Sequence, residues 1–296
     1  MEGHFGQRRS QNMSKSNSNF KGHTPTWCPG CGDWAIRLAI QNAMKALSLE
    51  PWNTRVVFGI GCSGNMNDFL NAYAIHSLHG RAIPNAIGLK LAHHNSPVIA
   101  IAGDGDSYGE GGNHFLHAAR GNHDITVIIH DNSIYGLTTG QAAPTSLQGM
   151  KAKSTPEGLI EVPINPLSLA LTQGATFIAQ AFAGDLKQTS ELIKKGIEHK
   201  GFSLVNILQP CVTFNKINTY HYYLSKTYKL DEKYNSGDYK QALEKAEELR
   251  EEKYPLGVMY EIQKPAYHEQ IDHLTDKNLS DKERFTDFKP ILDEFM

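Results

Sequence analysis

Apolar runs that alternate with helical patterns are the feature that most constrains the fold of this chain. Gly, Pro, Asp or a charged residue bounds most of these runs, as is typical of buried strands. The runs are RVVFGIG (55–61), PVIAIAG (97–103), DITVIIHD (124–131), TFIAQAF (176–182) and FSLVNILQP (202–210). Helical patterns accompany them at 33–47, 111–120, 166–174 and 185–201. Continuously apolar strands joined by helices predict an α/β fold, with a mostly parallel sheet covered by helices on both faces.

The composition excludes several classes of protein. Hydrophobic residues make up 40% of the 296 residues and charged residues 20%, as in ordinary globular proteins. A net charge of −2 gives no electrostatic footprint for nucleic acid or an anionic membrane. No apolar run approaches the roughly 18 residues of a transmembrane helix. Residues 1–21 are polar, without the apolar segment of a secretion signal, so we expect a cytoplasmic protein.

The chain is expected to divide into three parts. Residues 1–21, rich in Ser and Asn, predict a disordered tail. The α/β domain is expected over 22–214, with Asp33 capping its first helix. Residues 215–296 are expected to form a C-terminal extension wrapped over that domain, with a charged helix at 239–253 and irregular sequence after it. The apolar face of the first helix is expected to include Ile36, Leu38, Ala39, Met44 and Leu47.

A glycine-rich turn follows the run at 97–103. Its sequence, Gly103-Asp104-Gly105, lets the backbone approach a diphosphate where a helix N-terminus supplies amide donors. The Asp104 carboxylate would repel a bare phosphate, so this interpretation needs a bridging cation, and Mg²⁺ prefers oxygen ligands shared between protein and phosphates. Asn132, at the carboxyl end of the next run, supplies a second oxygen donor. A plain tight turn with a strand-end cap is the alternative.

The order strand, GDG, helix, strand and Asn resembles the thiamine diphosphate signature, in which a pair of Asn residues usually follows the GDG. The first position of that pair is Asp131 here, which departs from the pattern. The resemblance implies that Asp104, Asn132 and the Ile134 carbonyl bind Mg²⁺.

The four cysteines suit several kinds of site. Cys28 and Cys31, in WCPGCG, fit a thioredoxin-like motif, a zinc site or an iron–sulfur cluster. No apolar strand precedes Cys28, as a thioredoxin motif would need, and no second close pair follows, as a zinc ribbon would need. Cys62 and Cys211 each follow a strand, so four thiolates can converge at the edge of the sheet that carries the GDG turn. A [4Fe–4S] cluster uses such a cage, with structural zinc and ordinary buried thiols as alternatives.

Together with these motifs, longer segments resemble the β subunit of the 2-oxoacid:ferredoxin oxidoreductases. They are WCPGCGDW, GIGCSGN, LHGRAIPNAIGLKLA, GDGDSYGEGGNHFLHAARGN, DNSIYGLTTGQ and PCVTFNKINTYHYY, within about residues 26–223. The resemblance implies cluster ligation by Cys28, Cys31, Cys62 and Cys211. It implies cofactor contacts from Ile60, Gly61, Cys62, Ser63, Gly103, Gly105, Asp106, Gly136 and Leu137. His79 and Arg81 are candidates to face the diphosphate or the substrate, with loop bracing as the alternative.

By this resemblance, the chain is the catalytic β subunit of an enzyme that oxidatively decarboxylates a 2-oxoacid with coenzyme A. Electrons pass through one [4Fe–4S] cluster to ferredoxin. GGNHFLHAARGN and CVTFNKINTY are most similar to the 2-oxoglutarate branch, although Asn65 stands where some members carry a basic residue for the substrate carboxylate. A partner α subunit with the pyrimidine-binding domain is expected to supply the essential Glu. A non-oxidative thiamine diphosphate decarboxylase or ligase subunit and a zinc-stabilised binding protein are the alternatives.

Overall fold

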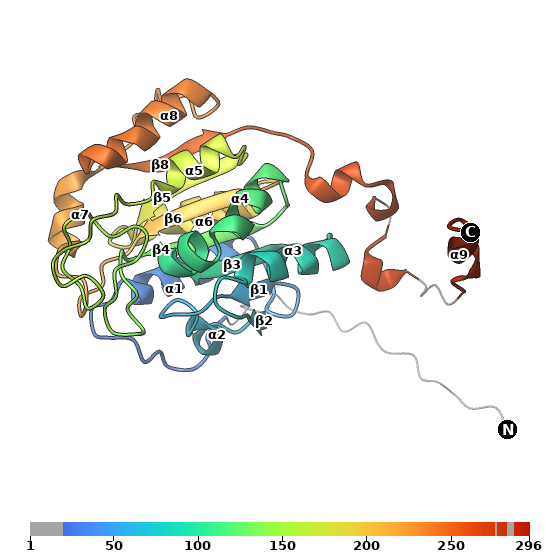
Figure 1. The fold of residues 1–296 in the computed structure, drawn as a ribbon, viewed down its shortest axis with the longest axis horizontal. Helices are drawn as coiled ribbons and strands as arrows, with labels where there is room; N and C mark the ends of the chain where they lie inside the picture. Colours follow the sequence, from blue (N-terminus) through green and yellow to red (C-terminus); the bar gives the residue numbers. More distant parts are fainter. Residues whose placement is uncertain (1–19, 276, 283–286) are drawn as a thin grey trace.

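The computed structural model describes residues 20–275, 277–282 and 287–296. An eight-stranded sheet lies between layers of helices, in the order β2-β1-β3-β4-β6-β5-β8-β7 (Figure 1). The strands are β1 (Arg55–Phe58), β2 (Tyr73–His76), β3 (Val98–Gly103), β4 (Thr126–Asp131), β5 (Phe177–Phe182), β6 (Ser203–Leu208), β7 (Thr227–Lys229) and β8 (Tyr254–Glu261). The α-helices are α1 (Asp33–Ala46), α2 (Met66–Phe69), α3 (Ala82–Ala92), α4 (Gly112–Arg120), α5 (Pro166–Thr172), α6 (Leu186–Glu198), α7 (Tyr220–Lys226), α8 (Tyr239–Glu247) and α9 (Lys289–Asp293).

The strands from β2 to β5 in this order pair in parallel, which confirms the predicted sheet. The inner strands β1, β3, β4, β5 and β6 are almost entirely buried because both of their faces are covered by helices. On one face, residues such as Val57, Ala100 and Val127 pack against α3, α4, α5 and α8. On the other, residues such as Phe58 and Ile99 pack against α1 and α6. The sheet therefore has two hydrophobic cores, and its carboxyl edge is left for the loops.

The first helix begins differently from its predicted form. Gly32 is the N-cap, and no side chain caps the helix. The carboxylate of Asp33 is instead fully buried and pairs with His130, 2.6 Å from its Nδ1 atom. Leu38 is 42% exposed, because it lies about 200° around the helix from the buried Ile36. Leu47 is the half-buried C-cap residue, so the predicted apolar face is correct for Ile36, Ala39 and Met44.

The C-terminal part contributes to the sheet, so the prediction of irregular sequence after the charged helix is wrong. Residues 254–261 form β8, which pairs antiparallel to β5, and β7 pairs with β8. Pro255 and Gly257 in YPLGVMYE obscure the strand pattern, and the register shift at Ile178/Ala179 accommodates the irregular pairing. The short, largely exposed edge strand β2 also had no clear apolar pattern.

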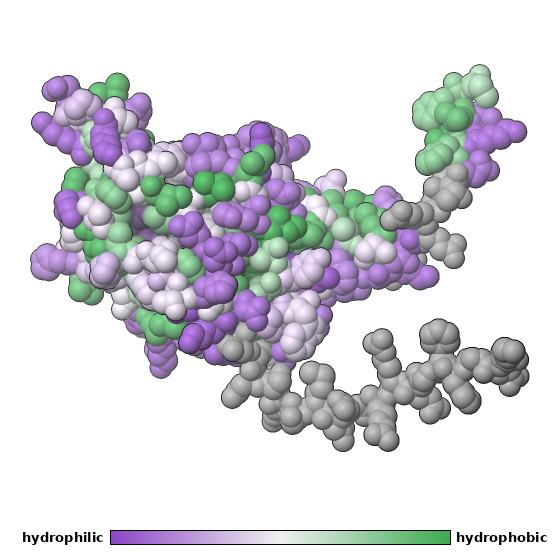
Figure 2. Space-filling model, turned by 90° about the horizontal axis from the view of Figure 1, so that it is seen from below, coloured by the Kyte–Doolittle hydropathy of each residue, from purple (hydrophilic) through white to green (hydrophobic). Residues whose placement is uncertain are grey.

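Beyond β8 the chain leaves the sheet as an arm. Its 3₁₀ turns η3 (Tyr267–Gln270), η4 (Asp272–Leu274) and η5 (Leu279–Asp281) lie beyond the end of α3, and α9 stands clear of the body (Figures 1 and 2). Of the tail predicted over 1–21, residues 1–19 lie outside the described residues. Phe20 is fully buried and Lys21 pairs with Leu70, so the described fold already begins there. Within the described ranges, no helix is long and apolar enough to span a bilayer.

Three aromatic rings in edge-to-face contact pack the segment after β3 against the core. Phe115 in α4 contacts Tyr108 and Phe202 edge to face, with ring centroids 5.2 and 5.6 Å away. Phe115→Ala should lower the free energy of unfolding by about 3–5 kcal/mol, because it leaves a cavity between fully buried rings. Leu224→Ala, on a side chain that is 67% exposed, should change it by less than about 0.5 kcal/mol. Denaturant titrations measure both, and equal losses in the two variants would contradict the packing argument.

Candidate active site at the carboxyl edge of the sheet

The segments that follow β1, β3, β4 and β6 meet at one edge of the sheet. The chain passes from β1 to β2 on one side and from β3 to β4 on the other side. The loops after β1 and β3 therefore diverge, and a crevice opens between them. The empty space of this cavity, part of it open to solvent, is about 490 Å³. Its lining includes all the residues predicted to contact the cofactor: Ile60, Gly61, Cys62, Ser63, Gly103, Gly105, Asp106, Gly136 and Leu137.

Glycines let the turn after β3 pass close to its neighbours. A Cβ on Gly105 would lie 2.3 Å from Cε1 of Tyr135, and a Cβ on Gly59 would lie 1.7 Å from Oδ2 of Asp106. The chain after Asp104 winds into a single π-helical turn, η1 (Gly105–Glu110), before α4 begins. Such turns are frequent at functional sites, and this one holds Asp106 against the cavity.

The three predicted Mg²⁺ ligands, Asp104, Asn132 and Ile134, all line this cavity. Asp104 is 2% exposed, and one of its oxygens accepts a hydrogen bond from Thr145 Oγ1 at 2.5 Å. Burial, followed by the charge of Asp131, raises the pKa of Asp104 to about 8. A buried carboxylate in this environment is ionised at neutral pH when a cation neutralises it. The set therefore offers oxygen donors of the kind that Mg²⁺ binds.

Asp131 lies outside the lining of this cavity, although its charge acts on Asp104. Its carboxylate accepts hydrogen bonds from Asn206 Nδ2 at 3.2 Å and Ser133 Oγ at 3.4 Å. It lines a second, larger cavity, between the loop after β4 and the start of β8, and not the cavity around Asp104. The departure from the usual Asn pair therefore leaves the donor set unchanged.

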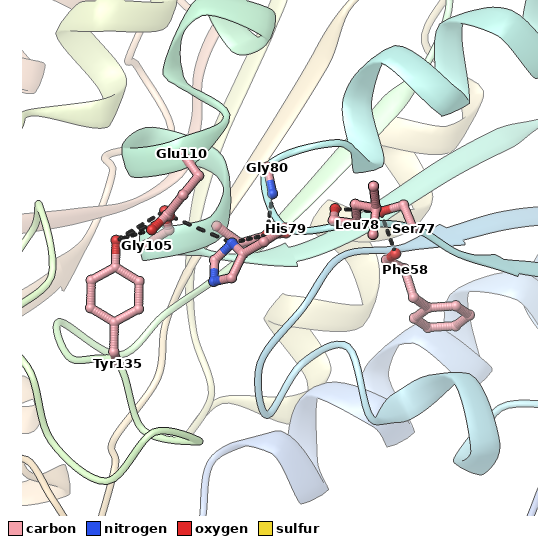
Figure 3. A network of polar contacts seen from close by, with 9 residues as sticks. Phe58, Ser77, Leu78, His79, Gly80, Gly105, Glu110 and Tyr135 are labelled. Atoms are coloured by element: carbon pink, nitrogen blue, oxygen red, sulfur yellow. Dashed lines mark hydrogen bonds and ion pairs between the residues drawn. The ribbon is translucent and has the colours of Figure 1, made fainter.

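The two candidate catalytic residues take different places. His79 lines the cavity, and its Nδ1 lies 2.7 Å from Asp106 Oδ1 and 3.5 Å from Glu110 Oε2. Glu110 also accepts a hydrogen bond from the Tyr135 hydroxyl, and Figure 3 shows its carboxylate between the phenol and the imidazole. Arg81 is outside the lining, where its guanidinium contacts His114. The structure thus brings His79, but not Arg81, to the cavity.

The cysteine segments meet beside the cavity. Gly32 N donates to Pro210 O at 3.1 Å, which holds the CPGC turn against the end of β6. Trp27 Nε1 donates to Cys62 O at 2.7 Å. A Cβ on Gly136 would lie 3.4 Å from the sulfur of Cys62 and 3.8 Å from that of Cys211.

Burial, followed by the nearby charges of Asp33, Cys211 and Cys28, raises the pKa of Cys62 to about 12. No disulfide joins the four cysteines, and Cys28 is the exposed one. Over the described ranges, no three His, Cys, Asp or Glu side chains are placed to hold a single metal ion. Adjacent thiols that favour the neutral form need a positive group among them before they can ionise.

Several residues at this edge were not predicted from the sequence. His130 pairs with Asp33, Gln209 Nε2 lies 3.3 Å from the Cys31 sulfur, and Thr145 bonds Asp104. A histidine within the apolar run TVIIHD was a usable signal for the first. Thr145 and Gln209 carried no comparable signal, because their roles depend on contacts between segments distant in the chain.

Four buried polar atoms on the cavity-lining residues have no hydrogen-bond partner in the described part of the chain. They are Ser63 Oγ, Asp106 Oδ2, His130 Nε2 and Gln209 Oε1. Leaving a buried polar atom unpaired costs about 1–3 kcal/mol, so four of them around one cavity indicate a polar occupant. The glycines, the oxygen donors and these unpaired atoms together fit a diphosphate held through a cation.

Comparison with known protein families identifies the class of protein to which this fold and cavity belong. Residues 59–207 match the family described as thiamine pyrophosphate enzyme, C-terminal TPP binding domain. Residues 211–276 match the family described as the C-terminal part of the pyruvate ferredoxin oxidoreductase beta chain. Fold and cavity are therefore those of a thiamine diphosphate enzyme.

Whole-chain comparisons are more specific. The 2-oxoacid:ferredoxin oxidoreductase subunit beta of Saccharolobus solfataricus is 43% identical, over 82% of this chain and 84% of the relative. The 2-oxoglutarate synthase subunit KorB of Methanocaldococcus jannaschii is 35% identical, over 85% and 93%. A solved 2-oxoglutarate:ferredoxin oxidoreductase from Magnetococcus marinus has a TM-score of 0.87 and 38% identity, over 96% of both chains. This chain belongs to the β subunits of the 2-oxoacid:ferredoxin oxidoreductases.

The close approach of Gly105 to Tyr135 yields a matched pair of variants. Gly105→Ala should weaken thiamine diphosphate binding at least about tenfold, or about 1.4 kcal/mol, because its Cβ displaces the Tyr135 ring at the cavity. Gly112→Ala, where a Cβ would meet nothing within 4 Å, should bind the cofactor as the wild type does. Calorimetry in the presence of Mg²⁺ measures both affinities, and equal values for Gly105→Ala and wild type would contradict the close-approach argument.

Proposed function

We propose that this chain binds thiamine diphosphate through Mg²⁺, together with one [4Fe–4S] cluster, and oxidises 2-oxoglutarate with coenzyme A in complex with an α subunit. Ferredoxin is the proposed electron acceptor, and the cytoplasm the proposed location. The observation that carries the proposal is a single one. The cavity that is lined by the oxygen donors Asp104 and Asn132 is also lined by Cys62. The sulfurs of Cys62 and Cys211 both lie next to Gly136.

The residues of the cavity fit the cofactor. Asp104, the Asn132 amide oxygen and the Ile134 carbonyl are the proposed Mg²⁺ ligands, and Thr145 orients the Asp104 carboxylate. The unpaired Ser63 Oγ can donate a hydrogen bond to a diphosphate oxygen, and the glycines let the backbone come close to the diphosphate. When bound, thiamine diphosphate supplies the electron sink that decarboxylation of a 2-oxoacid requires.

The cysteines fit a cluster better than a single zinc ion. Zinc sites place four ligands about 2.0–2.3 Å from one ion, and the described residues contain no set of three such side chains ready for an ion. A [4Fe–4S] cluster is larger and is held by four more widely spaced thiolates. A cluster at Cys28, Cys31, Cys62 and Cys211 would lie against the cofactor cavity, as a one-electron acceptor must.

His79 is the proposed residue for positioning the substrate. It is partly exposed, lines the cavity, and is held by Asp106 and Glu110 with Nδ1 toward them. This orientation leaves Nε2 to donate or accept a hydrogen bond. Asn65 is the N-cap of α2 and does not line the cavity, so a cationic group for the substrate carboxylate is assigned to the partner subunit.

The dependence on a partner follows from the same lining. No glutamate of the described residues lines the cavity, and the Glu110 carboxylate at its margin is bound by Tyr135 and His79. Thiamine diphosphate enzymes use a Glu at the aminopyrimidine ring, so we place that Glu on the α subunit. The cavity would then lie at the interface between the two subunits.

The names of relatives support the choice of substrate. The solved Magnetococcus marinus enzyme is described with 2-oxoglutarate, coenzyme A and succinyl-CoA bound, and it spans nearly this whole chain. The KorB relatives carry the same substrate in their names. By analogy, the product here would be succinyl-CoA.

Loss of one cysteine should remove the cluster and spare the cofactor. Cys211→Ser should lose iron, acid-labile sulfide and visible absorbance when purified without oxygen, because one of four thiolates is gone. Thiamine diphosphate affinity should change by less than about threefold, since Cys211 does not line the cofactor cavity. Metal analysis and calorimetry measure the two properties. Full iron content in the variant, or zinc in place of iron in the wild type, would refute the cluster.

Variants of Asp104 and Asp131 should separate cofactor binding from cluster binding in the opposite way. Asp104→Asn should weaken Mg²⁺-dependent thiamine diphosphate binding at least about a hundredfold, or about 2.8 kcal/mol, because it removes a charged metal ligand. Asp131→Asn should retain that binding, since the side chain faces the second cavity. Both variants should keep their iron. Equal cofactor affinity in the two variants would contradict the assigned metal ligand.

The complete proposal is tested by reconstitution. The chain alone and the chain co-expressed with its α subunit are each loaded with cofactor and cluster, and ferredoxin reduction is followed with 2-oxoglutarate or pyruvate. We expect turnover only from the complex, with a kcat/KM for 2-oxoglutarate at least about tenfold above that for pyruvate. Comparable turnover from the chain alone would refute the shared active site, and a preference for pyruvate would refute the substrate.

A further inference from the structure

Gln209 joins the end of β6 to the cysteine region, and its side chain is rigidly placed. The residue is 1% exposed, and its backbone N–H donates to Asp131 O at 2.8 Å. A Cβ on Gly32 would lie 2.6 Å from Gln209 Cγ. The glycine that follows the CPGC turn is therefore required for the Gln209 stem to pass.

The amide of Gln209 faces a cysteine sulfur. Its Nε2 lies 3.3 Å from Cys31 Sγ, within hydrogen-bonding distance for sulfur. Its Oε1 is buried and has no partner in the described part of the chain. The Cys31 sulfur also lies 3.3 Å from Asp33 Oδ2, and the other Asp33 oxygen is held by His130.

The state of Cys31 decides which of these contacts persists. As a thiol, Cys31 donates a hydrogen bond to Asp33 Oδ2. As a cluster ligand it is a thiolate, which only accepts hydrogen bonds, so the donor that remains beside it is the Gln209 amide. A hydrogen bond to a charged sulfur in a buried site is stronger than one to a neutral group.

From these contacts we infer that Gln209 is a positioning residue that raises the reduction potential of the cluster, an inference that rests on the proposed [4Fe–4S] site. The reduced cluster carries one more negative charge than the oxidised one. A donor aimed at a ligating sulfur therefore stabilises the reduced form more, and this shifts the potential upward. The buried Asp33 carboxylate acts in the opposite direction, and the Gln209 amide offsets it.

Cys31 is the sulfur on which such tuning acts. Cys28 is exposed, and the sulfurs of Cys62 and Cys211 face the backbone of Gly136. In the described residues, Cys31 is the cysteine that receives a hydrogen bond from a side-chain N–H group.

The test compares two glutamine variants of the holo complex with its α subunit. Gln209→Met keeps the length of the side chain and removes the donor. Gln41→Met makes the same change at another buried glutamine, which lies on α1 and whose Nε2 donates to Phe20 O at 2.9 Å. Iron content is measured first, and the midpoint potential of the cluster is then obtained by redox titration followed by electron paramagnetic resonance.

We expect Gln209→Met to move the midpoint potential to a more negative value and Gln41→Met to leave it at the wild-type value. Should Gln209→Met fail to retain iron, Gln209→Glu, which keeps the volume and adds a carboxylate, is titrated in its place with the same expected direction. An unchanged or raised potential in an iron-replete Gln209 variant would overturn this inference alone. Absence of iron from the wild type would overturn the cluster assignment and this inference with it.

Discussion

The parallel pairing of β1, β3, β4 and β6 is the constraint on which the site depends. Its register pairs Phe58 with Ile101 and Gly103 with His130, so the loops after these strands leave the sheet at one level. Alternation along β4 then directs His130 toward Asp33 and Asp131 toward the second cavity. A slip of one residue would exchange these two side chains. The apolar packing on both faces therefore fixes the chemistry at the edge.

Local patterns predicted most of this arrangement from the sequence. The continuous apolar strands could be placed because a sheet covered on both faces shows no alternation. The GDG turn was informative because only glycine tolerates the approach of Tyr135 at position 105. The strand ends could be brought together because parallel strands share one carboxyl edge, and that step alone collected Cys62, Asn132 and Cys211.

The features that were missed depend on contacts between distant segments. Thr145 reaches Asp104 from a long loop, and no local pattern records that contact. Asp33 looked like a helix cap because it begins a helix, but a buried histidine from β4 competes for its carboxylate. Strand β8, which lies between β5 and β7, was hidden by its proline and glycine, and its pairing with β5 carries a register shift. In each case a tertiary interaction overrode the local preference of the chain.

The carboxyl edge of the sheet contains several buried carboxylates, and the partners of these carboxylates explain how the edge can be stable. Asp33, Asp104, Asp106 and Asp131 are all nearly fully buried, and buried carboxylates are costly unless neutralised or hydrogen-bonded. Asp33 has His130, Asp106 has His79 and the Gly80 N–H, and Asp131 has Asn206. Asp104 has only a neutral hydroxyl partner among the described side chains, which makes it the position where a cation adds most. Because ligands that bind only the folded state stabilise it, the proposed metal site and the fold would support each other, and the residue most costly to bury would be the one that binds the cofactor.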